Sequence, residues 1–445
     1  MMKKLINLPP KIQEIVKIII INLALIFILV ESLSLAYFFL RTQRIYYRLS
    51  RQEKQQEISQ VDINLTGIRL DRNIVERLHP FFGFIMEPGP DFREGFEVNN
   101  YGFISPYNYP YIRQHENQYL IGVFGGSVAQ SYAINEIETK ILEKRLKELP
   151  DFANKEIIIL PFTTGGYKQP QQLLILNYFL SIGQELDMVI NMDGFNEVAL
   201  SYVNHQNYID IAMPSGQHII PLANLANNSL SATALKTLLK IQDQKEKLSH
   251  AVTRLENCKL AFCHTFNAIY INNLAQNYRR DIKRFERARR KREDDSYENN
   301  VIYYNKTNTR LTDAILFEEI TRNWLNASLL IHQITSQRNI LYFHILQPNQ
   351  YYQTQRVFTA DEQKTAFSDD SNYGKAVKIG YPKLITKIDE LKKNGVQFIN
   401  TVNSFDQIKE TIYIDSCCHY NDVGEDIISS DVAASIVQFL TSPQR

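Results

Sequence analysis

Residues 119–129 read YLIGVFGGSVA, a short apolar run followed by two glycines and a serine. The run Tyr119–Phe124 has the length of a strand and contains β-branched and aromatic side chains, which favour strands. The residues after the glycines predict a helix that extends to Leu149. A strand that passes through a tight turn into a helix is the building unit of parallel α/β sheets. This stretch therefore predicts the fold class of the chain.

The same alternation of apolar runs and helical segments recurs towards the C-terminus. The further predicted strands are Glu156–Phe162, Met188–Met192, Asn339–Leu346, Val396–Thr401 and Thr411–Ile414, and Pro170–Ile182 is a predicted helix. Strands that alternate with helices argue for a parallel sheet with both faces covered. We therefore predict an α/β fold with a three-layer, doubly wound parallel sheet.

The composition excludes a chain that is disordered throughout, a collagen-like repeat and a small disulfide-stapled protein. The chain has 445 residues, of which 44% are hydrophobic and 22% charged, and these are ordinary globular proportions. Its formal net charge is +1, so no global basic field argues for nucleic acid, and none is expected as a partner. Only four cysteines are present, so disulfides do not hold the fold together.

An apolar run near the N-terminus, Ile18–Leu40, predicts a membrane anchor. As a helix its 23 residues reach about 34 Å, enough to cross a hydrocarbon core of about 30 Å. The run is too long for a signal peptide and no small-residue cleavage site is evident, so we expect an uncleaved anchor rather than a buried core helix. We expect its Glu31 to snorkel to the surface; the alternatives are an arginine partner or a partner helix.

The charges that flank the run do not decide its orientation. Basic residues occur on both sides: Lys3, Lys4, Lys11 and Lys17 before it, and Arg41, Arg44, Arg48, Arg51 and Lys54 after it. The positive-inside rule finds no clear excess on either side.

The rest of the chain divides by composition. We predict an N-terminal flank (1–17), the anchor (18–40), a stalk (41–75, most polar at Gln52–Asn64) and an α/β domain (76–445). The domain opens with an irregular, aromatic lead-in, Pro80–Pro110, and contains a charged helical insertion over about 202–311. Within the insertion Leu235–Tyr278 has helical periodicity, and nine of the fifteen residues of Tyr278–Arg292 are Lys or Arg. We expect that basic run to form a solvated helix face, and binding to an anionic surface or glycan is the alternative.

Polar residues that could carry chemistry follow four of the predicted strands. In order they are Gly125-Gly126-Ser127, Thr163-Thr164-Gly165-Gly166, Asp193-Gly194-Phe195-Asn196-Glu197, and Asp415-Ser416-Cys417-Cys418-His419 with Asn421 and Gly424. Active sites of parallel sheets lie at the carboxyl ends of the strands. Each group alone is more often a turn, a helix cap or a structural histidine. Together they place Ser, Gly, Asn and His in order, each at a strand end.

That order resembles the SGNH hydrolases, the GDSL-type esterase and lipase superfamily. Gly126 stands where the first block of the family often has an acid, Gly166 matches the second block with Gly165 as a competing alignment, and Gly194-Phe195-Asn196-Glu197 matches the third. Tyr101-Gly102-Phe103 and Gln347-Pro348-Asn349-Gln350 resemble the bacterial membrane-anchored subset. The resemblance covers roughly residues 95 to 440, without much of the basic insertion.

The resemblance implies a serine mechanism that needs no metal and no cofactor. Ser127 would be the nucleophile, His419 the general base and Asp415 the residue that orients the histidine. The oxyanion donors would be the N–H groups of Ser127 and Gly166 and the side-chain amide of Asn196. One departure concerns the acid, because the family's Asp usually stands three residues before the His and Asp415 stands four before it.

The resemblance and the anchor together predict a membrane-anchored, extracytoplasmic esterase or acyltransferase that acts on O-acyl groups, above all O-acetyl groups, of an envelope glycan. The alternatives are an inactive glycan-binding or scaffold protein of an envelope assembly complex, with protein partners there, and a lipid-active esterase at the membrane surface. For the four cysteines we expect buried free thiols. A metal site at Cys417, Cys418 and His419, or at Cys258 and Cys263, is a minor alternative, and a disulfide is possible outside the cytoplasm.

Overall fold

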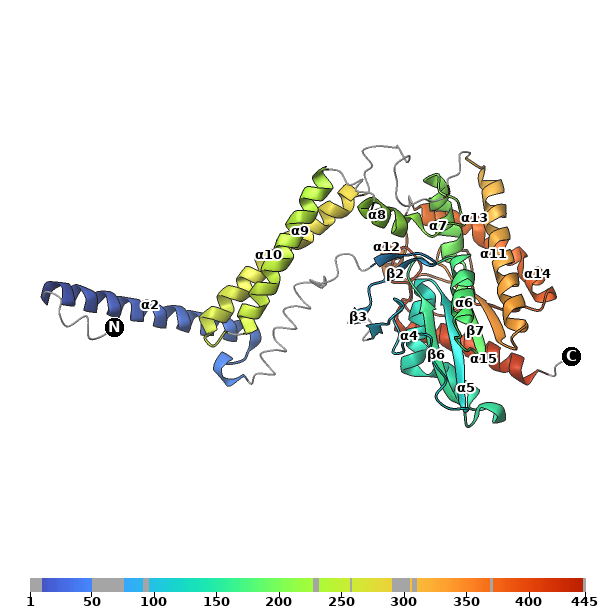
Figure 1. Ribbon diagram of the computed structural model, residues 1–445, viewed down its shortest axis with the longest axis horizontal. Coiled ribbons are helices and arrows are strands. Elements are labelled where there is room, and N and C mark those ends of the chain that lie inside the picture. The colour runs from blue at the N-terminus through green and yellow to red at the C-terminus, as the bar shows by residue number, and fades with distance from the viewer. Residues whose placement is uncertain are drawn as a thin grey trace. The chain divides into compact units, whose positions relative to one another are not determined.

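The computed structural model describes residues 10–49, 76–90, 96–226, 232–256, 258–289, 305, 310–368 and 371–442. The chain forms two compact units. Unit 1 contains Met1–Ile74 with Asn228–Glu298, and unit 2 contains Val75–Asn227 with Asn299–Arg445. Figure 1 shows the elements of both units along the chain. Most of the predicted stalk lies outside the described residues.

Unit 2 is an α/β structure built on a parallel sheet of five strands, as the alternation of the sequence predicted. The strands are β5 (Gln118–Gly125), β6 (Glu156–Thr163), β7 (Met188–Asp193), β8 (Leu341–Leu346) and β9 (Gln397–Asn400). Their order is β6-β5-β7-β8-β9, and all neighbouring pairs are parallel. The chain moves from β5 outward to β6 and then returns to β7 on the other side of β5. Consequently, the carboxyl ends of β5 and β7 lie side by side at the point where the strand order reverses.

Helices flank this sheet. They are α4 (Ser127–Thr139), α5 (Ile141–Leu146), α6 (Gln171–Ser181), α7 (Phe195–Gln206), α8 (Gly216–Ala226), α11 (Asp313–Ser336), α12 (Ala360–Thr365), α13 (Asn372–Thr386), α14 (Ile388–Lys393) and α15 (Asp422–Thr441). Helix α4 packs against β5, β6 and β7, and α15 packs against α4 and α5. Helix α11 packs against β8 and α6, and α13 packs against α7 and α11. The strands are buried along almost their whole length, which explains why they read as continuous apolar runs.

The structure corrects three of the predicted elements: two of them have different limits, and one is not a strand. The helix predicted to reach Leu149 is interrupted at Lys140, which adopts a left-handed conformation (φ 57°) between α4 and α5. Strand β8 begins at Leu341 because Asn339 also has a positive φ of 57°. The predicted strand Thr411–Ile414 is wrong, since this segment makes only an isolated bridge between Tyr413 and Tyr420.

The aromatic lead-in is more regular than its sequence predicted. It contains β2 (Gly83–Met86), which pairs antiparallel with the preceding β1 (Glu76–His79), and β3 (Gly89–Pro90), which pairs antiparallel with β4 (Glu97–Val98). Its aromatic side chains Phe82, Phe84 and Phe103 are fully buried. The lead-in is therefore part of the core of unit 2 rather than a loose connection.

Unit 1 is helical in its described residues. It contains the long helix α2 (Pro10–Thr42), the 3-10 turn η1 (Tyr46–Arg48), and the helices α9 (Ala232–Glu256) and α10 (Ala261–Arg289). Within α2, the 29 residues Glu14–Thr42 are long and apolar enough to cross a membrane, and a signal sequence would pass the same test. Helices α9 and α10 pack against each other as a hairpin, so the predicted helical stretch Leu235–Tyr278 is two helices.

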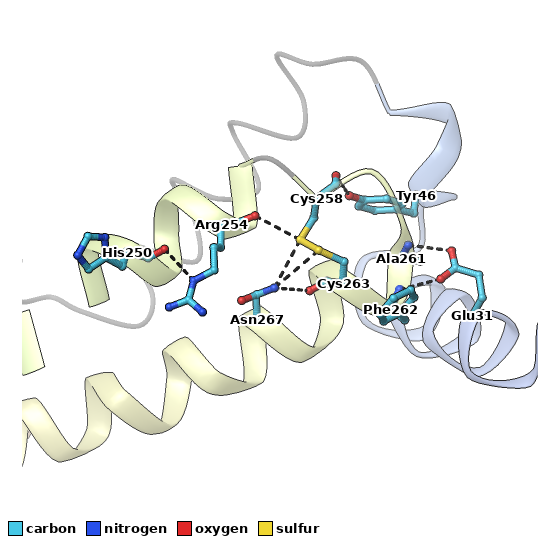
Figure 2. The surroundings of a disulfide bond; sticks show 9 residues. All are labelled: Glu31, Tyr46, His250, Arg254, Cys258, Ala261, Phe262, Cys263 and Asn267. Atoms are coloured by element: carbon cyan, nitrogen blue, oxygen red, sulfur yellow. Dashed lines mark hydrogen bonds between the residues drawn. A yellow bond between two sulfur atoms is a disulfide. The ribbon is translucent and has the colours of Figure 1, made fainter. Parts of the chain in front are cut away.

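Two of the four cysteines are not the free thiols that we expected. Cys258 and Cys263 form a disulfide across the turn between α9 and α10, with their Cα atoms 5.5 Å apart (Figure 2). The spacing of five residues allowed this pairing, but only the turn between two helices brings the side chains together. Cys417 and Cys418 are free.

Candidate active site

The nucleophile candidate, Ser127, is the first residue of α4 and follows β5 through two glycines. Gly125 has a φ of +150°, and a Cβ at this position would lie 2.2 Å from the carbonyl oxygen of Met192 on β7. A Cβ on Gly126 would lie 2.1 Å from the side-chain nitrogen of Asn196. The two glycines therefore allow the end of β5 to approach β7 closely enough to place Ser127 beside Asn196.

His419 lies on the segment between β9 and α15 and reaches Ser127 across the edge of the sheet. Its Nε2 is 2.7 Å from Oγ of Ser127, within hydrogen-bonding distance. About a third of the His419 side chain is exposed, so a substrate can reach the pair. The backbone beyond it turns directly into the last helix, because the side chain of Asn421 caps α15 by accepting from the N–H of Gly424 at 3.0 Å. The sequence pattern Asn421…Gly424 is thus a helix start that fixes the position of His419.

Asp415 hydrogen-bonds Nδ1 of His419 through Oδ2. Its other oxygen, Oδ1, accepts the backbone N–H groups of Cys417 at 2.9 Å, Cys418 at 3.0 Å and His419 at 3.3 Å. The unusual spacing of four residues is therefore accommodated by a turn that wraps around the carboxylate. Burial acts to raise the pKa of Asp415, but the hydrogen bond and charge of His419 and the N–H donors outweigh it and lower this pKa to about 2.

The segment after β8 holds this turn from outside. Three of its side chains donate to three successive carbonyls of the turn, each at 3.0 Å: Gln350 to Asp415, Tyr351 to Ser416 and Asn349 to Cys417. The Tyr420 hydroxyl donates back to the carbonyl of Pro348 at 2.7 Å. The segment Gln347-Pro348-Asn349-Gln350 therefore positions the backbone that carries Asp415 and His419.

The residues expected to bind an oxyanion lie on the other side of Ser127. The side-chain amide of Asn196 is fixed by a hydrogen bond of 2.8 Å to the carbonyl of Tyr167. A Cβ on Gly165 would be 3.9 Å from Cβ of Ser127, so the loop after β6 passes directly beside the nucleophile. Gly166 follows with a φ of +84°. The structure therefore brings Ser127, the loop that contains both glycines, and Asn196 together.

A histidine that the sequence analysis missed lies beside Gly166. A Cβ on Gly166 would be 2.2 Å from Nε2 of His218, whose ring stacks on Phe84 with centroids 4.6 Å apart. The Nδ1 of His218 pairs with Glu76. No local pattern could have identified this pair, since the two residues are 142 positions apart and meet only through the packing of α8 on β1.

A buried polar network supports the end of β7. Oδ1 of Asp193 accepts from Nε1 of Trp324 at 2.7 Å and contacts Nε2 of His344 at 2.8 Å, and Nδ1 of His344 lies 2.8 Å from Oγ of Ser328. All four side chains are almost fully buried. The carboxylate of Asp193 is thus engaged by Trp324 and His344, and the network fixes the strand end that precedes Asn196.

Glu197 belongs to the same structural layer. Its carboxylate accepts the N–H groups of Gly194 at 2.7 Å and Gln169 at 2.9 Å, so it joins the start of α7 to the loop after β6. Burial, with a smaller contribution from Asp193, raises the pKa of Glu197 to about 8. The side chain of Gln172 also donates to this carboxylate, at 3.2 Å. These contacts fit a positioning role for Glu197.

Cys417, Cys418 and His419 form the one cluster of metal-ligand side chains among the described residues, with their donor atoms within 4.8 Å of one another. The cluster fits a metal poorly. Both ring nitrogens of His419 are already engaged by Ser127 and Asp415. Burial, together with the neighbouring Cys417, raises the pKa of the Cys418 thiol well above its usual range, whereas metals bind the thiolate.

No protein-family model matches the chain, and no curated protein sequence matches it. Ser127, His419 and Asp415 form a continuous chain of hydrogen bonds, and the side-chain amide of Asn196 lies beside Gly126, next to the serine. This arrangement can activate a hydroxyl for attack on a carbonyl carbon and can donate to the negative oxygen that results.

Proposed function

We propose that this protein is a serine esterase or acyltransferase of the SGNH type, with Ser127 as nucleophile. The chain of hydrogen bonds from Ser127 through His419 to Asp415 carries this proposal. The strand order, equivalent to 2-1-3-4-5, supports a three-layer, doubly wound fold of the flavodoxin-like kind, in which ligands bind where the strand order reverses. Ser127 and Asn196 lie after the two strands that flank that point.

The proposed reaction is acyl transfer in two steps. Oγ of Ser127 forms a bond to the ester carbonyl carbon while Nε2 of His419 takes its proton, and His419 then gives this proton to the leaving alcohol as the ester bond breaks. Water or an acceptor hydroxyl repeats the sequence in reverse and releases the acyl group. Asp415 holds the imidazole with its proton on Nδ1 and stabilises the imidazolium.

The oxyanion would be bound by the N–H groups of Ser127 and Gly166 and by the Asn196 amide. Each such donor contributes roughly 2.7–4 kcal/mol of transition-state stabilisation. All three follow strands of the sheet: Ser127 begins α4 after β5, Gly166 lies in the loop after β6, and Asn196 lies in the first turn of α7 after β7. Their common position supports the assignment, because the groups must converge on one oxygen atom.

We propose that α2 is a retained anchor and that unit 2 is extracytoplasmic. Glu31 of α2 hydrogen-bonds the start of α10, which supports retention of the helix in the mature chain. The disulfide Cys258–Cys263 supports an oxidising compartment on the side of the membrane that holds unit 1's hairpin. An anchored esterase there meets acylated envelope polymers, so O-acetyl groups of an envelope glycan are the proposed substrate class.

Two alternative functions are distinguished from this proposal by the experiments below. The spacing of Asp415 favoured an inactive glycan-binding or scaffold protein, with envelope protein partners, but the turn around its carboxylate removes that reason. The anchor itself favours a lipid-active esterase. A preference for long acyl chains over acetyl would select that alternative.

Covalent labelling tests the proposal. The full chain, in detergent, is treated with a fluorophosphonate probe, and mass spectrometry locates the adduct. We expect an adduct on Ser127 that is lost in Ser127→Ala and in His419→Ala but persists in Ser181→Ala, which removes an exposed serine of α6. Absence of an adduct in a folded sample would refute the catalytic assignment.

Substrate class is tested separately. Initial rates on 4-nitrophenyl esters of acetate, butyrate and palmitate, and acetate release from an acetylated polysaccharide, compare short and long acyl groups. We expect the highest specificity constant for acetyl. A specificity constant that is highest for palmitate would favour the lipid-active esterase instead.

A further inference from the structure

The only acidic residue within the predicted apolar run of α2 is bound by another helix of the same unit. The carboxylate of Glu31 accepts the backbone N–H groups of Ala261 at 2.8 Å and Phe262 at 2.9 Å (Figure 2). The Tyr47 hydroxyl also donates to it. The first N–H groups of a helix have no acceptor of their own, and the helix dipole favours a negative charge there. The structure therefore differs from the expected snorkelling, because Glu31 caps α10.

The contacts around this cap join the closed end of the α9–α10 hairpin to α2. The ring of Phe262 packs edge-on against Phe27, with centroids 5.7 Å apart, and the ring of His264 packs against Phe38 at 5.3 Å. The Tyr46 hydroxyl donates to the carbonyl of Cys258 at 2.7 Å. We call residues 258–270 the hairpin tip; it comprises the disulfide-closed turn and the first part of α10.

The position of Glu31 sets the depth of the hairpin tip. Glu31 precedes Leu40, the last residue of the apolar run, by nine residues, which is about 13.5 Å along a helix. One half of the hydrocarbon core is about 15 Å thick. If α2 crosses the bilayer, the start of α10 lies well inside the hydrocarbon layer rather than at its surface.

The outer face of the hairpin tip has the polarity that this depth requires. Leu260–Tyr278 contains no Asp, Glu, Lys or Arg. Phe266, Ile269 and Tyr270, at helical spacing on one face of α10, are exposed by 60%, 45% and 44%. The run of basic residues begins only at Arg279, about 27 Å from Ala261 along the helix.

The one Lys, Arg, Asp or Glu residue of the hairpin tip is compatible with lipid. Lys259, in the turn, is exposed, and a lysine can extend its ammonium to the headgroups along its aliphatic stem. The backbone N–H groups of Ala261 and Phe262 at the start of α10 are paired, because Glu31 accepts both of them. An unpaired group would cost several kcal/mol in lipid.

We propose that the hairpin tip inserts into one leaflet of the bilayer beside α2, so that the protein contacts the lipid through two elements. The occupant of the exposed face of the tip is lipid rather than a protein partner, because α10 packs against α2, whose apolar side chains Ile28, Leu29 and Leu33 are likewise 59–60% exposed. The inference rests on the proposed anchorage of α2.

Depth-dependent quenching of tryptophan fluorescence tests the inference in the full chain. The protein is reconstituted into phosphatidylcholine vesicles with and without brominated acyl chains. Three variants are compared with the wild type: Phe266→Trp in the hairpin tip, Leu25→Trp in α2, and Leu239→Trp in α9. Leu239 is 71% exposed but lies about 25 Å from the end of α9 at the tip. The single native tryptophan, Trp324, is fully buried in unit 2 and supplies the background.

We expect brominated lipid to quench the added emission of Phe266→Trp and Leu25→Trp by at least half, and that of Leu239→Trp by less than a tenth. Quenching at Leu25→Trp without quenching at Phe266→Trp would overturn the inference and leave the anchor intact. Absence of quenching at Leu25→Trp would overturn the anchorage as well. Fluorophosphonate labelling of Ser127 is measured in the same samples, so failure of the catalytic proposal is recognised independently.

Discussion

The substitution Asp415→Asn probes the relation between the catalytic turn and the tautomer of His419. The native carboxylate accepts four hydrogen bonds, one from the imidazole and three from the backbone of the turn. A carboxamide has one oxygen and one NH₂ group. If the NH₂ faces Nδ1, His419 carries its proton on Nε2 and cannot accept the proton of Ser127. If the NH₂ group faces the turn instead, its N–H donors point at the three backbone N–H donors of the turn, and those three hydrogen bonds are lost.

The second orientation keeps the base but sets the NH₂ group against three N–H donors, so the first orientation is favoured. Because the first orientation removes the base, the loss should be large. A change of tautomer in a serine triad costs about four powers of ten in kcat. At 1.36 kcal/mol per factor of ten, this is about 5.4 kcal/mol of transition-state stabilisation. We expect a smaller change in stability, because the 40% exposed side chain keeps at least one of its hydrogen bonds in either orientation.

The assay is the second-order rate of fluorophosphonate labelling, followed by hydrolysis of 4-nitrophenyl acetate. Asp431→Asn, at an exposed position of α15, is the matched control and should react like the wild type. Circular dichroism verifies that both variants are folded. Labelling of folded Asp415→Asn within threefold of the wild-type rate would refute the role of Asp415, although Ser127 and His419 would keep theirs.

Four other predictions follow from the site and the anchor unit. Asn196→Ala should lower kcat by about 10²–10³-fold with little change in KM, as measured by steady-state kinetics, because one oxyanion donor is lost; an equal rate would remove Asn196 from the oxyanion site. Gln350→Leu should slow labelling of Ser127 about tenfold while the Tm of unit 2 changes by only a few degrees, since one brace of the turn is lost; an unchanged rate would contradict this positioning role. Asp415, with a folded pKa of about 2 against a usual 3.8, should stabilise the protein above about pH 4 and lose this contribution as the pH falls towards 2; thermal melts of Asp415→Asn should lack that part of the pH dependence, and parallel melting profiles would contradict it. Alkylation of the unfolded chain without reductant should modify two cysteines, and reaction of all four would contradict the disulfide at Cys258.

The sequence predicted the sheet well, because its strands are buried on both faces and therefore appear as uninterrupted apolar runs. β5, β6 and β7 lie within a residue or two of their predicted limits. Thr411–Ile414 failed because an apolar run of four residues has no period that distinguishes a strand from a buried loop. The split between α4 and α5 failed because nothing in the sequence marks Lys140 as left-handed.

The site was predictable where its chemistry is local and unpredictable where it depends on packing. Ser127 and Asn196 follow strands directly, so the topology alone places them together. The contact of His218 with Gly166 and the capping of α10 by Glu31 join segments that are far apart in the chain. Such pairings follow from tertiary structure, and no spacing in a single sequence encodes them.

The hydrogen bond between Ser127 and His419 joins residues 292 positions apart, with all of unit 1's hairpin encoded between them. A chain that is still being synthesised therefore contains the proposed nucleophile long before the proposed base. Premature termination anywhere before residue 419 leaves an ordinary, unreactive serine. Esterase activity would thus arise only in completed chains, and its appearance during synthesis reports that the C-terminal segment has joined the sheet.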